Sequence, residues 1–214
     1  MRRLIVCLML LLPGLLFAQH KKHPKKPAYN EEAEIALLRK HYDCFYTGKY
    51  SVEQRNEFYP FNTAGKIQLL SFMQPYDRFG DKEPTDGGPM YVQQADSSYA
   101  INESRVVIRL TLGKTDIDSL TNILYNYGFT PIRKPRTNVI LINEPNGCYE
   151  PRSALLFLDV EGKVKEYIEY CFSCQGMSKS SQKISGYVMC NGKYEMLRQF
   201  FFNKGLTFGI RLRN

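Results

Sequence analysis

Cysteine is the residue type in this sequence whose number and spacing could support chemistry. The 214-residue chain contains six cysteines but only three histidines, and His20 and His23 lie in a lysine-rich segment near the N-terminus. This scarcity of histidine excludes most histidine-based metal sites and most Cys/His or Ser/His catalytic pairs. Four cysteines cluster in the second half of the chain, and clustering of this kind in an exported protein favours disulfide bonds. These candidates are Cys148, Cys171, Cys174 and Cys190.

A structural staple is the first interpretation of this cluster. The preferred pairing joins Cys148 to one member of the Cys171/Cys174 pair and Cys190 to the other, although spacing leaves the connectivity open. Five cysteines remain once a leader containing Cys7 is removed, so at least one lacks a partner within the chain. Cys44 is expected to be that cysteine and to behave as a small buried apolar residue.

Two other chemistries compete with the staple. Cys171 and Cys174 form a C-x-x-C pair, which in a redox protein needs a depressed thiol pKa, usually at a helix N-terminus. Here a strand precedes the pair and a loop follows it. Alternatively, Cys148, Cys171, Cys174 and Cys190 could supply four thiolates to a tetrahedral metal site. Haem attachment is excluded because Gln175, not histidine, follows Cys174.

Two glutamates near the cysteines invite an acid–base interpretation. Glu166 and Glu169 lie three positions apart on a predicted strand, so their side chains should point to opposite faces of the sheet. A carboxylate pair that works on one substrate needs both groups on one face. The sequence therefore indicates no catalytic residue and no cofactor.

The N-terminus has the layout of a secretory leader. Arg2 and Arg3 precede an apolar run at positions 4–17, and cleavage is expected after Ala18. Residues 19–29 then form a basic flexible tail. The formal charge of +8 falls to +6 without the leader, and four tail lysines supply most of that excess. The body thus lacks the basic stripe of a nucleic-acid-binding protein, whereas the tail could make weak contact with an anionic envelope surface.

The remaining sequence, residues 30–214, predicts a single α+β domain. Hairpin-forming strands predominate, and helical periodicity occurs early, centrally and late, which indicates a mainly antiparallel sheet with about three helices packed on one face. The predicted helices span residues 31–48, 115–127 and 193–204. The predicted strands span residues 66–73, 90–94, 105–112, 137–142, 153–160, 163–171, 183–189 and, at an edge, 206–210.

A family resemblance enters at the segment that begins Cys148-Tyr-Glu-Pro-Arg152 and ends Cys171-Phe-Ser-Cys174. This segment resembles the C-x-x-P-R … C-F-x-C pattern of an uncharacterised family of small exported proteins from Bacteroidota-type bacteria. The resemblance covers roughly residues 115–210. It implies a location in the bacterial envelope and transfers no activity or catalytic residue.

Arg152 has two interpretations. It could pair with Glu166 or Glu169 across the predicted hairpin, or it could contact an anionic ligand beside the cysteines. We therefore expect an exported, disulfide-stabilised binding or structural module with an envelope partner or ligand. A thiol–disulfide redox protein or sensor using Cys171 and Cys174, and a cysteine-ligated metal-binding module, are the alternatives.

Overall fold

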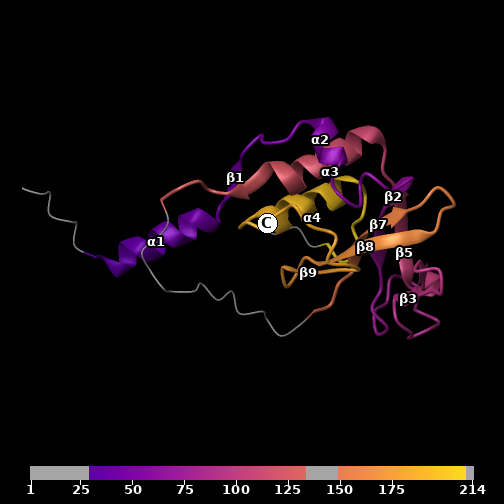
Figure 1. Cartoon of the computed structure of the whole chain (residues 1–214). Helices are drawn as coiled ribbons and strands as arrows, with labels where there is room; N and C mark the ends of the chain where they lie inside the picture. Colours follow the sequence, from indigo (N-terminus) through magenta and orange to yellow (C-terminus); the bar gives the residue numbers. More distant parts are fainter. Residues whose placement is uncertain (1–28, 134–148, 211–214) are drawn as a thin grey trace, which may run out of the picture. The chain divides into compact units, whose positions relative to one another are not determined.

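The computed structural model describes residues 29–133 and 149–210 (Figure 1). The chain divides into two units, residues 1–30 and 31–214, and every helix and strand described below belongs to the second. The predicted leader and nearly all of the basic tail lie outside the described residues. The helices are α1 (Glu31–Tyr42), α2 (Val52–Asn56), α3 (Lys114–Asn126) and α4 (Lys193–Asn203), with a 3-10 turn η1 (Glu103–Arg105). The strands are β1 (Cys44–Tyr46), β2 (Lys66–Phe72), β3 (Tyr91–Gln93), β4 (Tyr99–Ile101), β5 (Val106–Thr111), β6 (Tyr127–Phe129), β7 (Ser153–Leu158), β8 (Val164–Cys171) and β9 (Gly176–Lys179).

An antiparallel sheet forms the centre of the domain. Its strands lie in the order β3-β4-β8-β7-β2-β5, and β9 also pairs with β8. All six residues of β7 are buried, because this strand lies inside the sheet and both of its faces are covered. The predicted α+β class, with a mainly antiparallel sheet, is confirmed, as is the hairpin between β7 and β8. No helix in the described part of the chain combines the length and apolarity needed to span a membrane.

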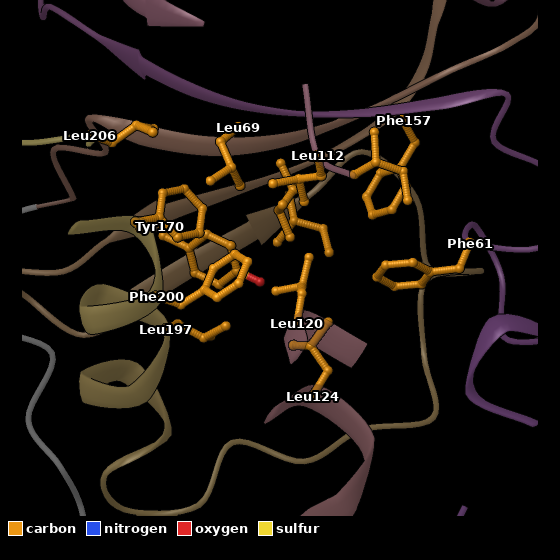
Figure 2. Close-up of a cluster of buried hydrophobic side chains, with 14 of the residues drawn as sticks. Phe61, Leu69, Leu112, Leu120, Leu124, Phe157, Tyr170, Leu197, Phe200 and Leu206 are labelled. Carbon is orange, nitrogen blue, oxygen red and sulfur yellow. The ribbon is translucent and has the colours of Figure 1, made fainter. Parts of the chain in front are cut away.

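Helices α3 and α4 cover one face of this sheet and bury the larger core with it. Leu120 and Leu124 of α3 are fully buried, as is Leu197 of α4 (Figure 2). They pack against sheet residues that include Leu69 and Tyr170. The apolar spacing that predicted both helices therefore also identified the faces that they bury.

The opposite face of the sheet carries a smaller apolar cluster that includes Leu70, Phe72 and Leu156. Arg105 fixes the long loop beside this cluster. Its Nε donates to the carbonyl of Met73 at 2.7 Å, and its Nη1 donates to the carbonyl of Gly88 at 3.1 Å. A buried arginine thus satisfies carbonyls at both ends of a loop that contains only an isolated bridge between Phe79 and Lys82.

The first predicted helix is shorter than expected. It ends at Tyr42, and the next residues form β1, which pairs with β6 in a separate two-stranded sheet. Phe45, which lies within the helix predicted over residues 31–48, is instead in β1 and is 46% exposed. Aromatic residues favour extended backbone when a partner strand is present, and β6 supplies that partner. Among the described helices, neither α1 nor α2 contributes a side chain to either core cluster.

Two predicted strands are not strands. Residues 183–189 are irregular, because Gly186 has φ +89° and the carbonyl of Ile184 accepts from Lys179 Nζ at 2.7 Å rather than from a neighbouring strand. Residues 206–210 form a turn around Gly209, which has φ +72°. The predicted strand at 137–142 lies outside the described residues.

Candidate functional site

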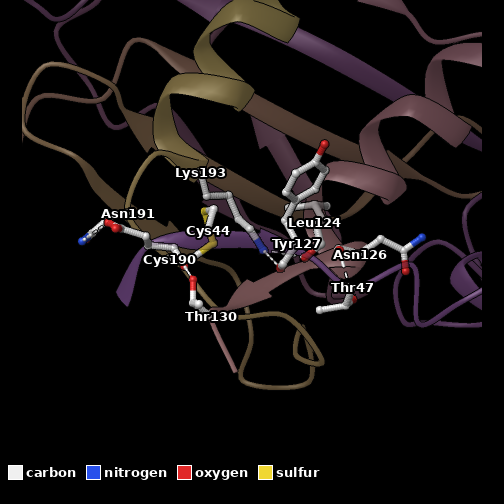
Figure 3. The surroundings of a disulfide bond; sticks show 10 residues. Cys44, Thr47, Leu124, Asn126, Tyr127, Thr130, Cys190, Asn191 and Lys193 are labelled. Atoms are coloured by element: carbon white, nitrogen blue, oxygen red, sulfur yellow. Dashed lines mark hydrogen bonds between the residues drawn. A yellow bond between two sulfur atoms is a disulfide. The ribbon is translucent and has the colours of Figure 1, made fainter. Parts of the chain in front are cut away.

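A disulfide between Cys44 and Cys190 joins the N-terminal segment to the start of α4. The two Cα atoms are 5.0 Å apart although the cysteines are 146 positions apart in sequence. The flanking backbone is paired as well: the Cys44 amide donates to the carbonyl of Asn191 at 3.2 Å, and the Asn191 amide donates to the carbonyl of Tyr42 at 2.7 Å. We call this region, shown in Figure 3, the junction.

Lys193 lies buried beside the disulfide in the junction (Figure 3). Its Nζ donates to the carbonyl of Leu124 at 2.8 Å and to the carbonyl of Tyr127 at 2.7 Å. These carbonyls lie at the C-terminal end of α3, where helical carbonyls lack partners and a cation is favoured. Burial lowers the pKa of Lys193 to about 8 because the ammonium group loses its hydration. The arrangement indicates a structural cap on α3.

The second disulfide joins Cys171 and Cys174 within the turn between β8 and β9. Cys171 is buried at the end of β8, whereas Cys174 is half-buried in the turn. A strand, not a helix, follows the pair, so it has no helix N-terminus to lower a thiol pKa. The C-x-x-C pair thus closes the turn of a hairpin, and strand β9 lies where the sequence predicted a loop.

The predicted connectivity is wrong. Cys44 is bonded to Cys190 and not unpaired, and Cys171 and Cys174 are bonded to each other and not to more distant partners. The reason is that the chain leaves α1 at Tyr42 in an extended conformation, which brings Cys44 alongside Asn191. Cys148 lies outside the described residues. Among residues 29–133 and 149–210, no three His, Cys, Asp or Glu side chains converge in a group that could hold a metal ion.

A cleft with a volume of about 710 Å³ opens beside the Cys171–Cys174 turn. Its walls come from the loop after β2, the residue before β7, the β8–β9 turn, α4 and the turn that follows α4. We call it the arginine cleft. It is lined by Asp77, Arg78, Phe79, Arg152, Phe172, Ser173, Arg198, Thr207, Phe208, Gly209 and Ile210.

Arg152 lies in this cleft, but its predicted partners are wrong. Its Nε and Nη2 donate to the two carboxylate oxygens of Asp77 at 2.6 and 2.7 Å, and Nη1 lies 3.3 Å from a carboxylate oxygen of Glu150. Arg152 precedes β7 and so lies beyond the end of the hairpin, out of register with Glu166 and Glu169. The hydrogen bonds to Asp77 raise the pKa of Arg152. Burial acts to raise the pKa of Asp77, but the bonds from Arg152 and the Gln74 amide lower it on balance.

Gly209 allows the turn after α4 to lie directly against Arg152. A Cβ atom at position 209 would be 2.6 Å from the Cβ of Arg152, which is closer than side chains approach. The residue also has φ +72°, a conformation that favours glycine. Two walls of the arginine cleft are therefore in direct contact.

Glu166 and Glu169 do point to opposite faces of the sheet. Glu166 is buried on the helical side, where it accepts hydrogen bonds from the hydroxyls of Tyr59, Ser180 and Ser181. Glu169 lies on the other side. Burial raises its pKa to about 7, against the opposing charge of Arg105. The two carboxyl groups cannot share a substrate, which agrees with their spacing on the strand.

Most of the arginine cleft was missed by reasoning from the sequence. Arg152 was singled out, but Asp77 was seen only as part of an acidic loop, and Arg198 and Phe208 were not singled out, because only the folded chain brings these segments together. The one available signal was the Asp-Arg-Phe run at positions 77–79 in a turn-rich loop, and its composition is ordinary for a loop. Comparison with known protein families, with curated proteins and with solved structures finds no match to this chain, so the site has to be interpreted from its own geometry.

Proposed function

We propose that this protein is an exported, disulfide-stabilised binding module of the bacterial envelope and that the arginine cleft is its binding site. Arg152, the residue that the sequence offered as a ligand contact, then supports the cleft from within. Its guanidinium is held by Asp77 and Glu150, which fixes its orientation.

The observation that carries this proposal is the size and construction of the arginine cleft. A volume of about 710 Å³ falls within the range of small-molecule sites, roughly 300–1,000 Å³. Five separate chain segments meet in its walls. Loops positioned by a rigid sheet are the usual place for binding residues.

Export is supported by two independent features. The first 18 residues have the three-part layout of a secretory leader. The described cysteines form two disulfides, and bonds of this kind persist in oxidising compartments outside the cytoplasm. The lysine-rich segment that follows the leader would then emerge beside an anionic surface.

Export is tested by producing the full chain in a bacterium and isolating its periplasm under alkylating, non-reducing conditions. We expect a mature N-terminus at Gln19, bonds Cys44–Cys190 and Cys171–Cys174, and an alkylated thiol at Cys148. Recovery of the intact leader in the cytoplasmic fraction, with all cysteines alkylated, would contradict export.

Binding is tested by filling the arginine cleft with Thr207→Trp. The matched control is Ser119→Trp, which fills a different hollow, between α3 and α4. We expect the low-molecular-weight fraction of a periplasmic extract to raise the Tm of wild type and of the control by at least about 2 °C, since ligands that bind only the native state stabilise it. Thr207→Trp should lose this shift. The same shift in all three proteins, or none in wild type, would count against the cleft.

Thiol–disulfide exchange is the second candidate function, favoured by the half-buried position of Cys174 in a bonded pair. In this reaction the reduced pair would pass two electrons and two protons to a substrate disulfide and itself become oxidised, with dithiothreitol as the external reductant. Insulin reduction by wild type, lost in Cys174→Ser, would support it. A metal-binding module, the third reading of the cysteines, predicts stoichiometric zinc in reduced protein purified without chelator.

A further inference from the structure

The central sheet curls strongly toward the face opposite α3 and α4. Strands β4 and β5 are separated in the strand order by β8, β7 and β2, yet only residues 102–105 connect them along the chain. This connection, which includes the turn η1, spans at most about 14 Å, whereas four strand spacings in a flat sheet cover about 19 Å. Phe72 of β2 and Tyr91 of β3 are equally far apart in the strand order, but their ring centroids lie only 6.3 Å apart. Both rings belong to the smaller apolar cluster, so the face that carries this cluster is the concave one.

A hollow with a volume of about 600 Å³ opens on this concave face. We call it the sheet hollow. Its floor includes Gln68 of β2 and Leu156 of β7, which are direct partners in the ladder. It is lined by Gln68, Gln94, Ala95, Asp96, Ser98, Tyr99, Ala100, Ile101, Glu103, Arg109, Leu156, Leu158, Gly162, Lys163 and Val164. Its volume is typical of small-molecule sites, as is its place at the mouth of a curled sheet, where ligands bind in β-barrels.

The charged side chains that line the sheet hollow are paired with one another. Lys163 Nζ donates to a carboxylate oxygen of Asp96 at 2.8 Å, and Arg109 Nη2 donates to a carboxylate oxygen of Glu103 at 2.7 Å. The hydrogen bonds from Lys163 and from Ser98 lower the pKa of Asp96, which keeps it an ionised acceptor. The two bases and two acids of the lining therefore cancel in charge.

Two neighbouring charges cancel as well. A carboxylate oxygen of Glu161 lies 3.6 Å from Lys163 Nζ, and Lys165 Nζ donates to the backbone carbonyl of Asp96 at 3.0 Å. An ionic ligand would give up its hydration and would have to compete with these existing pairs for a counter-charge. The described lining of the sheet hollow thus favours an uncharged ligand.

The same lining offers hydrogen-bonding groups above an apolar floor. Gln68 donates through its amide nitrogen to Thr111 Oγ1 at 3.1 Å, and Gln94 donates through its amide nitrogen to the carbonyl of Val92 at 3.0 Å. The amide oxygen of each glutamine can then accept a hydrogen bond from a ligand. Leu156 in the floor is fully buried within the smaller apolar cluster.

We propose that the sheet hollow is a second binding site and that its ligand is a neutral saccharide. A hydroxyl group both donates and accepts hydrogen bonds, so it can bond to the acid and to the base of a pair such as Glu103 and Arg109 without separating them. The C–H groups of a sugar ring suit the apolar floor and the ring of Tyr99, which is held edge-on against Tyr167 with centroids 5.0 Å apart. This inference goes beyond the proposed function, because the described residues that line the sheet hollow include none that line the arginine cleft.

The test is titration of the mature, oxidised, nitrogen-15-labelled protein with four sugars, followed by nuclear magnetic resonance. Glucose and N-acetylglucosamine are neutral, whereas glucuronate and, at pH 6, glucosamine carry a negative and a positive charge on a ring of the same size. We expect at least one neutral sugar to shift the amide signals of Gln68, Tyr99 and Lys163 in a saturable manner. The better neutral sugar should bind at least about fivefold more tightly than either charged sugar, because an unpaired charge is costly to desolvate.

Two substitutions test the hydrogen bonds and the charge balance separately. Gln68→Leu removes an amide from the floor and should weaken the better neutral sugar about threefold to tenfold, whereas Gln199→Leu, in the hollow between α3 and α4, should have no effect. Glu103→Gln leaves Arg109 without its acid, and the Glu103 side chain is 65% exposed, so folding should be unaffected. This variant should bind glucuronate about threefold more tightly than wild type. Glu83→Gln, which removes the acid of a pair beside the arginine cleft, should not.

Three outcomes would overturn the inference. The absence of saturable shifts with both neutral sugars would exclude a saccharide of this kind. Binding of glucuronate or glucosamine as tight as that of the neutral sugars would exclude the neutral ligand class. Shifts confined to signals of the arginine cleft, such as Arg152 and Thr207, with no effect of Gln68→Leu, would place the sugar in that cleft and not in the sheet hollow. The Thr207→Trp experiment tests the arginine cleft independently of all three.

Discussion

The two disulfides of this protein differ in what they join. Cys44–Cys190 connects segments 146 positions apart and is accompanied by backbone hydrogen bonds to Asn191 and by the buried Lys193. Cys171–Cys174 closes a turn of the β8–β9 hairpin, whose ladder already pairs Cys171 with Gly176. The first bond joins distant parts of the chain, whereas the second restrains a turn.

The contrast extends to the ionisable group near each bond. The junction buries a lysine whose pKa is lowered, and β8, which leads to the turn, carries a carboxyl group, Glu169, whose pKa is raised. Both shifts reflect the loss of hydration of a charged form. They give stability opposite dependences on pH, so each region can be examined separately.

Breaking the junction should have the largest effect. Replacing Cys44 and Cys190 together by serine should lower the free energy of unfolding by about 5 kcal/mol, because the unfolded chain regains the entropy of an open loop of this length. The urea midpoint measures this loss of stability. Failure of the variant to fold at 25 °C would also be consistent with the prediction. A loss no larger than that from the Cys171/Cys174 double variant would contradict the contrast.

Lys193→Met tests the buried cation in the junction. Between pH 8 and 10.5 the unfolded chain keeps a proton on this lysine that the folded protein has released, so the stability of wild type should rise with pH. The full rise is about 3 kcal/mol, and urea midpoints between pH 7.5 and 9.5 should show most of it. Lys193→Met should lack this rise, and exposed Lys66→Met should keep it. Parallel profiles for wild type and Lys193→Met would show that the pKa of Lys193 is not lowered.

Glu169→Gln tests the corresponding group on β8. The folded protein holds a proton on Glu169 up to about pH 7, whereas an unfolded glutamate releases it near pH 4.5, so wild type should lose stability as pH rises through this window. We expect a loss of about 2 to 3 kcal/mol, absent in Glu169→Gln and retained in exposed Glu161→Gln. Denaturant unfolding at pH 5, 6 and 7.5 distinguishes Glu169→Gln from wild type and from Glu161→Gln. A wild-type profile that Glu169→Gln fails to flatten would disprove the assignment.

Opening the turn should have the smallest effect. Replacing Cys171 and Cys174 by serine should cost about 2 kcal/mol or less, because the loop that the bond closes is only a few residues long. The far-ultraviolet circular dichroism spectrum should be unchanged, since the β8–β9 ladder remains. Loss of the native spectrum would show that the turn, and not the junction, holds the domain together.

Elements with their own apolar pattern were predictable, and elements that depend on a distant partner were not. The strands β2, β5, β7 and β8 and the helices α3 and α4 lie close to their predicted positions, because alternation or helical spacing decides which side is buried. Residues 183–189 were also predicted as a strand, yet Ile184 and Tyr187 pack in the larger core from irregular backbone. These side chains can be buried without a strand because a side chain, Lys179, donates a hydrogen bond to the backbone carbonyl of Ile184.

The candidate site was predictable only in part. Arg152 was identified as a residue with a role, but its partner Asp77 lies 75 positions away and no local pattern connects them. The prediction that Cys44 is unpaired assumed that the first helix continues past this residue. The extended chain after Tyr42 depends on pairing with β6, and that pairing depends on where α3 ends.

What the sequence by itself determined is therefore the class of fold, the principal strands and helices, and the opposite orientations of Glu166 and Glu169. These follow from periodicity, which acts over a few residues and needs no knowledge of distant segments. The tertiary structure alone decided the disulfide pairing, the burial of Lys193 and the arginine cleft. Each of these requires segments far apart in the chain to meet, and the free energy that brings them together comes from the shared core and not from the residues that meet.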